Sequence, residues 1–215
     1  MIYMIRINEL VKCIGNYRCL ADVGCDHGYL IIEAFKMYDL EEAIAIDNKK
    51  GPLSQAMANL NSYEFKDNVV FSLSSGIKEI SNNTDVVVIA GMGGMLISDI
   101  LNDDLKNVQR LILQPNRDIL EVRTKTAKLG FKITNEKIVY ENDKYYEIIV
   151  CDRSDEKINY SLDELEFGPC LLKEKSNLFV EKWKNEIDKL TIIKNNSNNN
   201  STILNKIERI SKIIC

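Results

Sequence analysis

Short apolar runs of strand length alternate, from residue 19 to about residue 130, with longer segments whose apolar positions recur every three or four residues. The apolar runs cover residues 19–25, 43–47, 69–73, 85–90 and 111–113. The longer segments suit helices at 29–38, from about 51 to 61 and from about 117 to 129. Strands that alternate with helices are typical of a doubly wound parallel sheet, so the pattern predicts an α/β fold.

The run at 85–90, Asp-Val-Val-Val-Ile-Ala, is the clearest candidate for a central strand. It is continuous and β-branched, as expected of a strand that is covered on both faces. Gly91, Gly93 and Gly94 follow it directly.

The pattern changes after Gly130. Strand-like runs at 131–140 and 145–151 are separated only by residues 141–144, which predicts an antiparallel hairpin that closes the sheet. From residue 161 to residue 215, helical apolar spacing continues on both sides of an asparagine-rich segment at 195–201. We therefore expect a sheet domain at 1–160 and a small, coiled-coil-like helical hairpin domain at 161–215, rather than an unfolded asparagine-rich tail.

The composition is that of an ordinary globular protein. With 45% hydrophobic and 28% charged residues, the chain is unlike disordered, collagen-like and disulfide-scaffold proteins. Apolar runs are too short to cross a bilayer, and Arg6, Glu9 and Lys12 interrupt the region where a secretory signal needs an apolar stretch. We expect a cytoplasmic protein with no membrane contact. Six cysteines without a Cys-x-x-Cys pair, beside one histidine, argue against a metal site.

The charge is unevenly distributed. The net charge of −4 disfavours a nucleic-acid ligand by itself. Between residues 106 and 137, however, eight Lys or Arg residues, beginning with Lys106, stand against three acids. This excess allows a basic face on an acidic protein.

The first strand leads into a glycine turn, Asp22-Val-Gly24-Cys-Asp26-His27-Gly28, before a helix. In doubly wound folds this turn binds nucleotide-like ligands. Asp47, at the end of the second strand, can accept hydrogen bonds from the two hydroxyls of a ribose and disfavours NADP. Both NAD and S-adenosyl-L-methionine fit such a site. An extra carboxylate at Asp26 would repel a pyrophosphate but suits a sulfonium or ammonium group, so the residues favour S-adenosyl-L-methionine.

The segments ADVGCDHGYL, AIDNKKGPLSQA, IAGMGGMLI, LILQPN and FGPCLLKEKSNLFVEKW together resemble the bacterial tRNA adenine-22 N1-methyltransferase family, in the same order and over almost the whole chain. The resemblance implies a Rossmann-like class I methyltransferase sheet that uses S-adenosyl-L-methionine to methylate N1 of an adenine in tRNA. It assigns the glycine turn to the cofactor, Asp47 to the ribose, and residues 90–94 to the wall between methyl donor and base. Where the family usually has Gly-Asp-Gly, this chain has Ser74-Ser75-Gly76, so the cofactor adenine loses a carboxylate partner.

We assign three sets of site residues on these grounds. The expected cofactor residues are Asp22, Gly24, Cys25, Asp26, His27, Gly28, Asp47, Asn48, Ser75, Gly76, Ala90, Gly91, Met92 and Gly93. The expected catalytic residues are Asp26, Met92 and Asn116. The expected substrate contacts are Tyr29, Gly94, Gln114, Tyr145, Lys173 and Lys175.

Several of these residues have a simpler structural explanation. Asp26 and Asn116 can cap the helices that follow them. His27 can act as a general base, but N1 of adenine already has a lone pair, so we favour hydrogen bonding of the imidazole to the backbone of the loop. The lysines of the helical hairpin can form a solvated face instead of contacting phosphates.

The expected partner is tRNA, with no metal and with the protein as a monomer or weak homodimer. Two alternatives stay open at this point. A small-molecule methyltransferase would use the same sheet without a salt-sensitive affinity for RNA, and a non-catalytic RNA-binding protein would bind RNA without methyl transfer.

Overall fold

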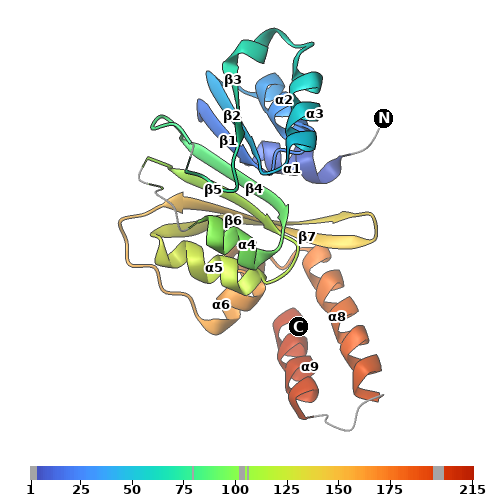
Figure 1. Ribbon diagram of the computed structural model, residues 1–215. Helices are drawn as coiled ribbons and strands as arrows, with labels where there is room; N and C mark the ends of the chain where they lie inside the picture. The colour runs from blue at the N-terminus through green and yellow to red at the C-terminus, as the bar shows by residue number, and fades with distance from the viewer. Residues whose placement is uncertain (1–3, 79, 102–104, 106, 196–200) are drawn as a thin grey trace.

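The computed structural model describes residues 4–78, 80–101, 105, 107–195 and 201–215. Its strands form one mixed sheet in the order β3-β2-β1-β4-β5-β7-β6 (Figure 1). The strands are β1 (Cys19–Val23), β2 (Glu42–Asp47), β3 (Val69–Leu73), β4 (Val86–Met92), β5 (Arg110–Pro115), β6 (Phe131–Glu141) and β7 (Lys144–Arg153). Strands β1 to β5 pair in parallel, and β7 runs antiparallel to both β5 and β6. The predicted fold class is confirmed.

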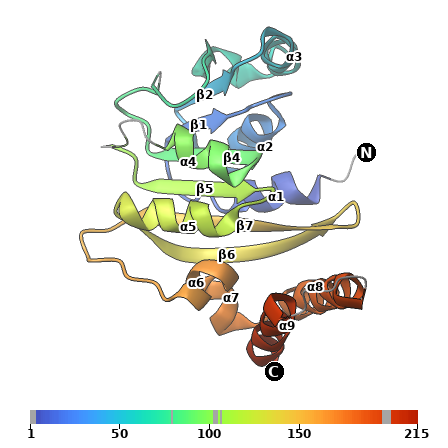
Figure 2. The same ribbon diagram turned by 60° about the horizontal axis from the view of Figure 1, so that its bottom comes forward.

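Helices cover both faces of the sheet. On one face lie α1 (Ile5–Lys12), α2 (Tyr29–Met37) and α3 (Lys50–Leu60), and on the other lie α4 (Gly94–Ile100) and α5 (Ile119–Lys128) (Figure 2). A short 3₁₀ helix, η1 (Glu64–Asn68), leads into β3. Alternate residues of β4 enter the two apolar clusters, Val86 and Val88 on one side and Val87 and Ile89 on the other. Because both faces of β4 are covered, successive residues of the strand are all apolar, which explains the continuous β-branched run that predicted a central strand.

The closing hairpin is tighter than the sequence pattern indicated. Glu141 pairs with Lys144, so only Asn142 and Asp143 form the turn. Both have positive φ, 51° and 59°, as a type I′ turn requires. The two strands therefore extend further than predicted at this end.

The C-terminal segment forms α6 (Leu162–Phe167), α7 (Pro169–Glu174), α8 (Asn177–Asn195) and α9 (Ser201–Ile214). Helices α8 and α9 pack side by side, and we call this pair the helical arm (Figures 1 and 2). The predicted helical hairpin is confirmed, while most of its asparagine-rich link, residues 196–200, lies outside the described part of the chain. Phe167, Trp183 and Ile210 share an apolar cluster with Ile138 of β6. The division into domains at residue 160 stays a prediction.

Two local features differ from the sequence-based expectation. Helix α1 was not predicted, although Ile7, Leu10 and Val11 have helical spacing, because its eight residues cover only about two turns and include three charged ones. Helix α3 begins at Lys50, one residue before the expected start, so Pro52 occupies its third position. It still lies within the first turn, where a missing N–H leaves no helical hydrogen bond unmade.

The basic excess between residues 106 and 137 is largely paired with acids in the fold. Five of its described cations form ion pairs with acids: Arg110 with Asp152, Arg117 with Asp118, Arg123 with Glu136 and Glu147, Lys132 with Glu156, and Lys137 with Glu9. Lys106 lies outside the described residues. A count along the sequence does not register these acids, so the ion pairs reduce the charge excess that would favour a basic face.

Two further properties bear on the site. Among the described residues, no helix combines the length and apolar character needed to cross a bilayer. The same residues contain no group of His, Cys, Asp and Glu side chains arranged to hold a metal ion.

Candidate active site

A cleft of about 580 Å³ opens at the carboxyl ends of β1, β2 and β4. In a parallel sheet this edge is the usual place for a ligand. Most of the predicted cofactor residues line the cleft, together with Tyr29: Asp22, Gly24, Cys25, Asp26, His27, Asp47, Asn48, Ser75, Ala90, Gly91 and Met92. We call it the cofactor cleft.

The turn between β1 and α2 forms one wall of this cleft. The backbone N–H groups of Gly24 and Cys25 both donate to the carbonyl oxygen of Ile46, at 2.8 and 3.0 Å, which ties the turn to β2. Gly28 is the N-cap residue of α2, so the expected capping by Asp26 is wrong. Asp26 instead has a positive φ of 46°, and its carboxylate is 68% exposed at the cleft.

Two buried carboxylates lie at the base of the cofactor cleft. Asp47 Oδ1 accepts a hydrogen bond from the backbone N–H of Lys49 at 2.9 Å. Asp22 is only 4% exposed. Burial, together with the negative charges of Asp47 and Asp26, raises the pKa of Asp22 to about 7. A cleft with this surplus of negative charge suits a cationic ligand.

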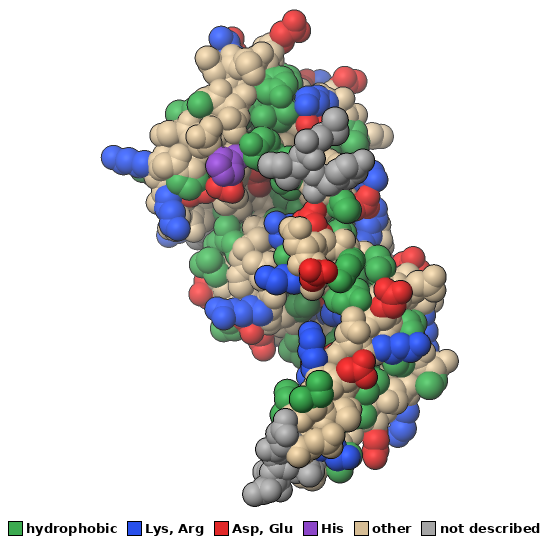
Figure 3. All heavy atoms as spheres, turned by 90° about the vertical axis from the view of Figure 1, so that its right-hand side faces the viewer, with side chains coloured by type: hydrophobic (Ala, Val, Ile, Leu, Met, Phe, Trp, Pro, Cys, Tyr) green, Lys and Arg blue, Asp and Glu red, His purple; other side chains and the backbone are tan. Residues whose placement is uncertain are grey.

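The side chain of His27 lies at the rim of the cleft, beside acidic side chains (Figure 3). Its Nε2 atom is 3.6 Å from Asp26 Oδ1, and its ring centroid is 5.6 Å from that of Tyr29. The His27 carbonyl oxygen accepts a hydrogen bond from Asn59 Nδ2 at 2.9 Å. The backbone of His27, rather than the expected imidazole, thus anchors the loop to α3. Burial raises the pKa of the neighbouring Cys25 thiol, which disfavours its reactive thiolate.

Gly91 forms a bulge at the end of β4, where the pairing with β5 shifts register between Ala90 and Met92. Its φ is 77°, which glycine adopts without a steric penalty. Its N–H donates to Gln114 Oε1 at 3.2 Å, and its carbonyl oxygen accepts from Asn116 Nδ2 at 2.7 Å. Gln114 Nε2 donates in turn to Asn116 Oδ1 at 3.1 Å. These bonds fix the direction of both side-chain amides.

This arrangement changes the interpretation of the Gln-Pro-Asn segment. Gln114, predicted as a substrate contact, is fully buried and does not line the cofactor cleft, and its side chain bonds Asn116 and Gly91. Asn116 is exposed, and the N-cap residue of α5 is Asp118, so the capping alternative for Asn116 is wrong.

Several predicted contacts lie outside the cofactor cleft. Gly94 is buried, and a Cβ atom there would collide with the carbonyl oxygens of Arg117 and Asp118. The absence of a side chain at Gly94 lets α4 lie close to the Arg117–Asp118 backbone. The Gly94 N–H also donates a hydrogen bond to Arg117 O at 2.9 Å. The remaining expected cofactor residues that do not line the cleft are Gly28, Gly76 and Gly93.

A second and larger cavity of about 1210 Å³ lies between the end of the sheet and the helical arm. We call it the substrate groove. It contains Asn116, predicted as a catalytic residue, and Tyr145, predicted as a substrate contact, and it shares Arg6 and Gly91 with the cofactor cleft. Lys182 and Lys189, two of the hairpin lysines that the sequence offered as phosphate contacts, also line the groove. The remaining aromatic and basic residues of the groove were not predicted as site residues: Tyr140, Tyr146, Trp183, Arg6, Arg117, Lys144 and Lys206.

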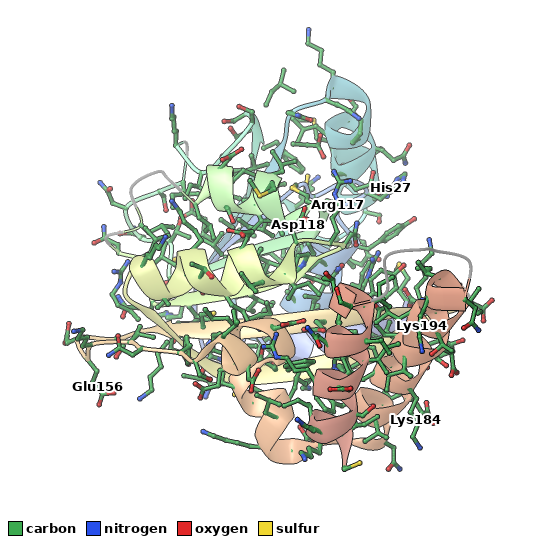
Figure 4. All side chains as sticks on the ribbon, turned by 90° about the horizontal axis from the view of Figure 1, so that it is seen from below. His27, Arg117, Asp118, Glu156, Lys184 and Lys194 are labelled. Carbon is green, nitrogen blue, oxygen red and sulfur yellow. The ribbon has the colours of Figure 1, made fainter. Side chains whose placement is uncertain are left out.

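The two lysines predicted as substrate contacts are elsewhere. Lys173 and Lys175 lie in or directly after α7, are exposed and line neither cavity. Figure 4 shows Arg117 and Asp118 on the same side of the molecule as His27, with Lys184 and Lys194 on the helical arm. No sequence motif marks the groove, because it is lined by residues from both ends and the middle of the chain.

Comparisons of the sequence and of the structure with known proteins point to one family. The family model TrmK, described as tRNA (adenine(22)-N(1))-methyltransferase, matches residues 20–214. The Bacillus subtilis (strain 168) tRNA (adenine(22)-N(1))-methyltransferase is 32% identical over 190 residues, which cover 85% of this chain and 80% of that protein.

Among the solved structures that resemble the whole chain, two contain S-adenosyl-L-methionine or S-adenosyl-homocysteine. A Streptococcus pneumoniae protein in complex with S-adenosyl-L-methionine superposes with a TM-score of 0.90 at 33% identity and covers 98% of this chain and 99% of its own. M. capricolum TrmK in complex with S-adenosyl-homocysteine gives a TM-score of 0.88 at 30% identity, with 100% and 98% covered.

The family model extends from the first residues of β1 to the end of α9, so the match includes the glycine turn, the Gly91 bulge and the helical arm. The resemblance expected from the sequence is confirmed. The chain belongs to the TrmK family of tRNA (adenine(22)-N(1))-methyltransferases.

Proposed function

We propose that this protein transfers a methyl group from S-adenosyl-L-methionine to N1 of adenine 22 in tRNA. The observation that carries the proposal is the meeting of two cavities at Gly91. One is acidic and suits a cationic cofactor, and the other is large, partly aromatic and suits a nucleotide chain.

The residues of the cofactor cleft fit S-adenosyl-L-methionine, which when bound supplies a methyl group on a positively charged sulfur. Asp47 would accept the ribose hydroxyls. Asp22 and Asp26 would offset the positive charges of the methionine end. Ser74 and Ser75 line the cleft where the resemblance implied a carboxylate, and they would offer hydroxyl groups to the adenine.

Asn116 would orient the target base. Its Nδ2 is bonded to Gly91 O, and its Oδ1 accepts one hydrogen bond from Gln114, which leaves a second lone pair on that oxygen. This lone pair can accept from the exocyclic amine of adenine, where positive charge grows as N1 is methylated. N1 has its own lone pair, so positioning rather than proton removal accounts for the rate.

The substrate groove would hold the RNA around the target nucleotide. N1 lies on the pairing edge of adenine, so the base must leave its stack or pair to reach the cofactor cleft. Tyr145 and the basic residues Lys144 and Lys189 line the groove and would contact bases and phosphates. One chain lines both cavities, so the protein would act as a monomer or weak homodimer, in the cytoplasm together with its tRNA substrate.

The test uses the full-length protein, labelled S-adenosyl-L-methionine and an unmodified tRNA transcript. We expect one methyl group per transcript, found as N1-methyladenosine at position 22 by nuclease digestion and mass spectrometry. A transcript with guanosine at position 22 is the matched control and should stay unlabelled. Cofactor binding without RNA labelling would contradict the proposal and favour a small-molecule substrate.

A further inference from the structure

Arg6 lies where the cofactor cleft and the substrate groove meet. Apart from Gly91, it is the one residue among the described lining residues that borders both cavities. It belongs to α1, the helix that the sequence pattern did not predict. The side chain is 28% exposed, so solvent or a ligand can reach it.

Neighbouring side chains hold the Arg6 guanidinium in place, but its paired carboxylate is not in close contact with it. Its Nη1 donates to the buried Gln114 Oε1 at 3.1 Å, and its Cζ lies 4.6 Å from the centroid of the Tyr146 ring. Its ion pair with Glu141 is long, with 4.0 Å between Arg6 Nε and Glu141 Oε2. An ion pair of this length leaves charge and N–H donors for another acceptor.

The charged residues of the cofactor cleft show which anion-binding groups are available beside Gly91. Asp22, Asp26 and Asp47 all line it, and among its described lining residues only Arg6 and Lys49 carry a permanent positive charge. Lys49 follows Asp47 at the end of β2, whereas Arg6 lies beside Gly91 at the end of β4, on the other side of β1. An anionic group that enters on the β4 side would therefore have Arg6 as its cationic partner.

We propose that Arg6 binds an oxyanion of a reactant at the junction of the two cavities. The inference rests on the proposed function, which supplies two such groups: the carboxylate at the methionine end of the cofactor and the phosphate next to the target adenosine. Arginine binds both through paired N–H donors. Tyr146 and Gln114 preset the guanidinium for this contact.

The test compares Arg6→Gln and Arg6→Lys with the wild-type protein. Arg18→Gln is the matched control, because Arg18 is exposed, pairs with Glu41 and lines neither cavity. Calorimetry gives the affinity for S-adenosyl-L-methionine and for 5′-methylthioadenosine, which lacks the carboxylate. Filter binding of the tRNA transcript over a salt series gives the RNA affinity and its salt dependence.

We expect Arg6→Gln to lose about ten- to hundredfold in affinity for one reactant, with Arg6→Lys retaining part of it. Weaker binding of S-adenosyl-L-methionine but not of 5′-methylthioadenosine identifies the carboxylate. Unchanged cofactor binding, with weaker tRNA binding and a log-affinity against log-salt slope flatter by roughly 0.7 to 0.9, identifies the phosphate.

Affinities and salt slope that match those of Arg18→Gln would overturn the inference. The binding measurements do not depend on turnover, so this outcome is distinct from failure of the proposed function, in which the wild-type protein itself would not methylate tRNA.

Discussion

Asp47 connects two parts of the cofactor cleft, because its buried carboxylate bonds the backbone after β2 and lies beside the turn after β1. We expect Asp47→Ala to weaken S-adenosyl-L-methionine binding by a few kcal/mol, since a hydrogen bond to a charged group contributes roughly 1.5 to 3 kcal/mol. Calorimetry measures this loss. Asp47→Asn is the control that keeps one acceptor for Lys49, and equal affinity in a folded Asp47→Ala protein would remove this residue from the site.

Asp22 gives the stability of the ligand-free protein a distinct pH dependence. Its pKa is about 7 in the folded protein, against an ordinary value of 3.8. The folded state therefore keeps a proton that the unfolded chain has lost, and this favours folding at low pH. The contribution is lost as the pH rises from about 4 to about 7, and it amounts to roughly 4 kcal/mol at most.

The measurement is urea denaturation of the wild-type protein and of Asp22→Asn at several values between pH 5 and pH 8. Other carboxylates affect both proteins alike, so the difference between the two isolates Asp22. The gain in the free energy of unfolding from Asp22→Asn should grow with pH and level off above pH 7. A difference that does not change with pH would show that Asp22 is already ionised.

His27 tests whether the reaction needs a base. His27→Gln removes proton transfer while keeping a polar side chain of similar size, and the anchoring bond from Asn59 goes to the backbone. We expect appreciable turnover to survive. A fall of about a thousandfold in kcat with cofactor affinity intact would point to general base catalysis, which is typically worth about 10²- to 10⁴-fold.

At the scale of the elements, a buried ionic cluster joins the sheet to the C-terminal helices. Arg123 of α5 is fully buried and pairs with Glu136 of β6 and Glu147 of β7, while its Nη1 donates to the carbonyl oxygens of Leu165 and Glu166 at 3.1 Å. Glu147 also pairs with Lys182 of α8. The cluster therefore fixes the helical arm to the strands beside the groove.

Arg123→Met should lower the free energy of unfolding by about 3 to 5 kcal/mol, because it leaves buried carboxylates without their partner. Thermal and urea unfolding measure the change. Lys132→Met is the matched control, since it breaks an exposed ion pair with Glu156 and should change the stability by less than about 1 kcal/mol. If the two variants lower the free energy of unfolding by similar amounts, the buried Arg123 cluster contributes no more to stability than an exposed ion pair.

The elements show why the sequence predicted some features and not others. The strands and the glycine turn were predictable because their signals are local: a β-branched run for β4, and an acid about 20 residues beyond a glycine turn for Asp47. Helix α1 carries a local signal only in Ile7, Leu10 and Val11, which is too short a run to predict a helix by itself. The burial of Arg123 could not be predicted, because it depends on acids in two strands that follow it in the sequence. The geometry of the glycine turn makes Gly28, and not Asp26, the N-cap of α2, and the sequence alone does not show this geometry.

At the scale of the whole molecule, RNA affinity should depend on the basic residues that line the substrate groove. It should not depend on how many basic residues a given segment of the sequence contains. Lys144→Glu and Lys189→Glu, both in the groove, should each weaken tRNA binding and flatten the salt slope by somewhat less than about one unit for every phosphate that the variant no longer binds. Lys173→Glu and Lys175→Glu make the same charge change outside it. If these two variants weaken binding more, the RNA follows α7 instead of the groove.

The residues of the substrate groove span nearly the full chain, from Arg6 to Lys206. The side of the groove formed by the helical arm is lined mainly by α8, and Lys206 is its lining residue from α9. Because a ribosome adds residues in sequence order, this side is added after the sheet has been made. Incomplete chains therefore lack part of the surface that would contact tRNA. We expect full tRNA affinity only after the helical arm has packed beside the sheet.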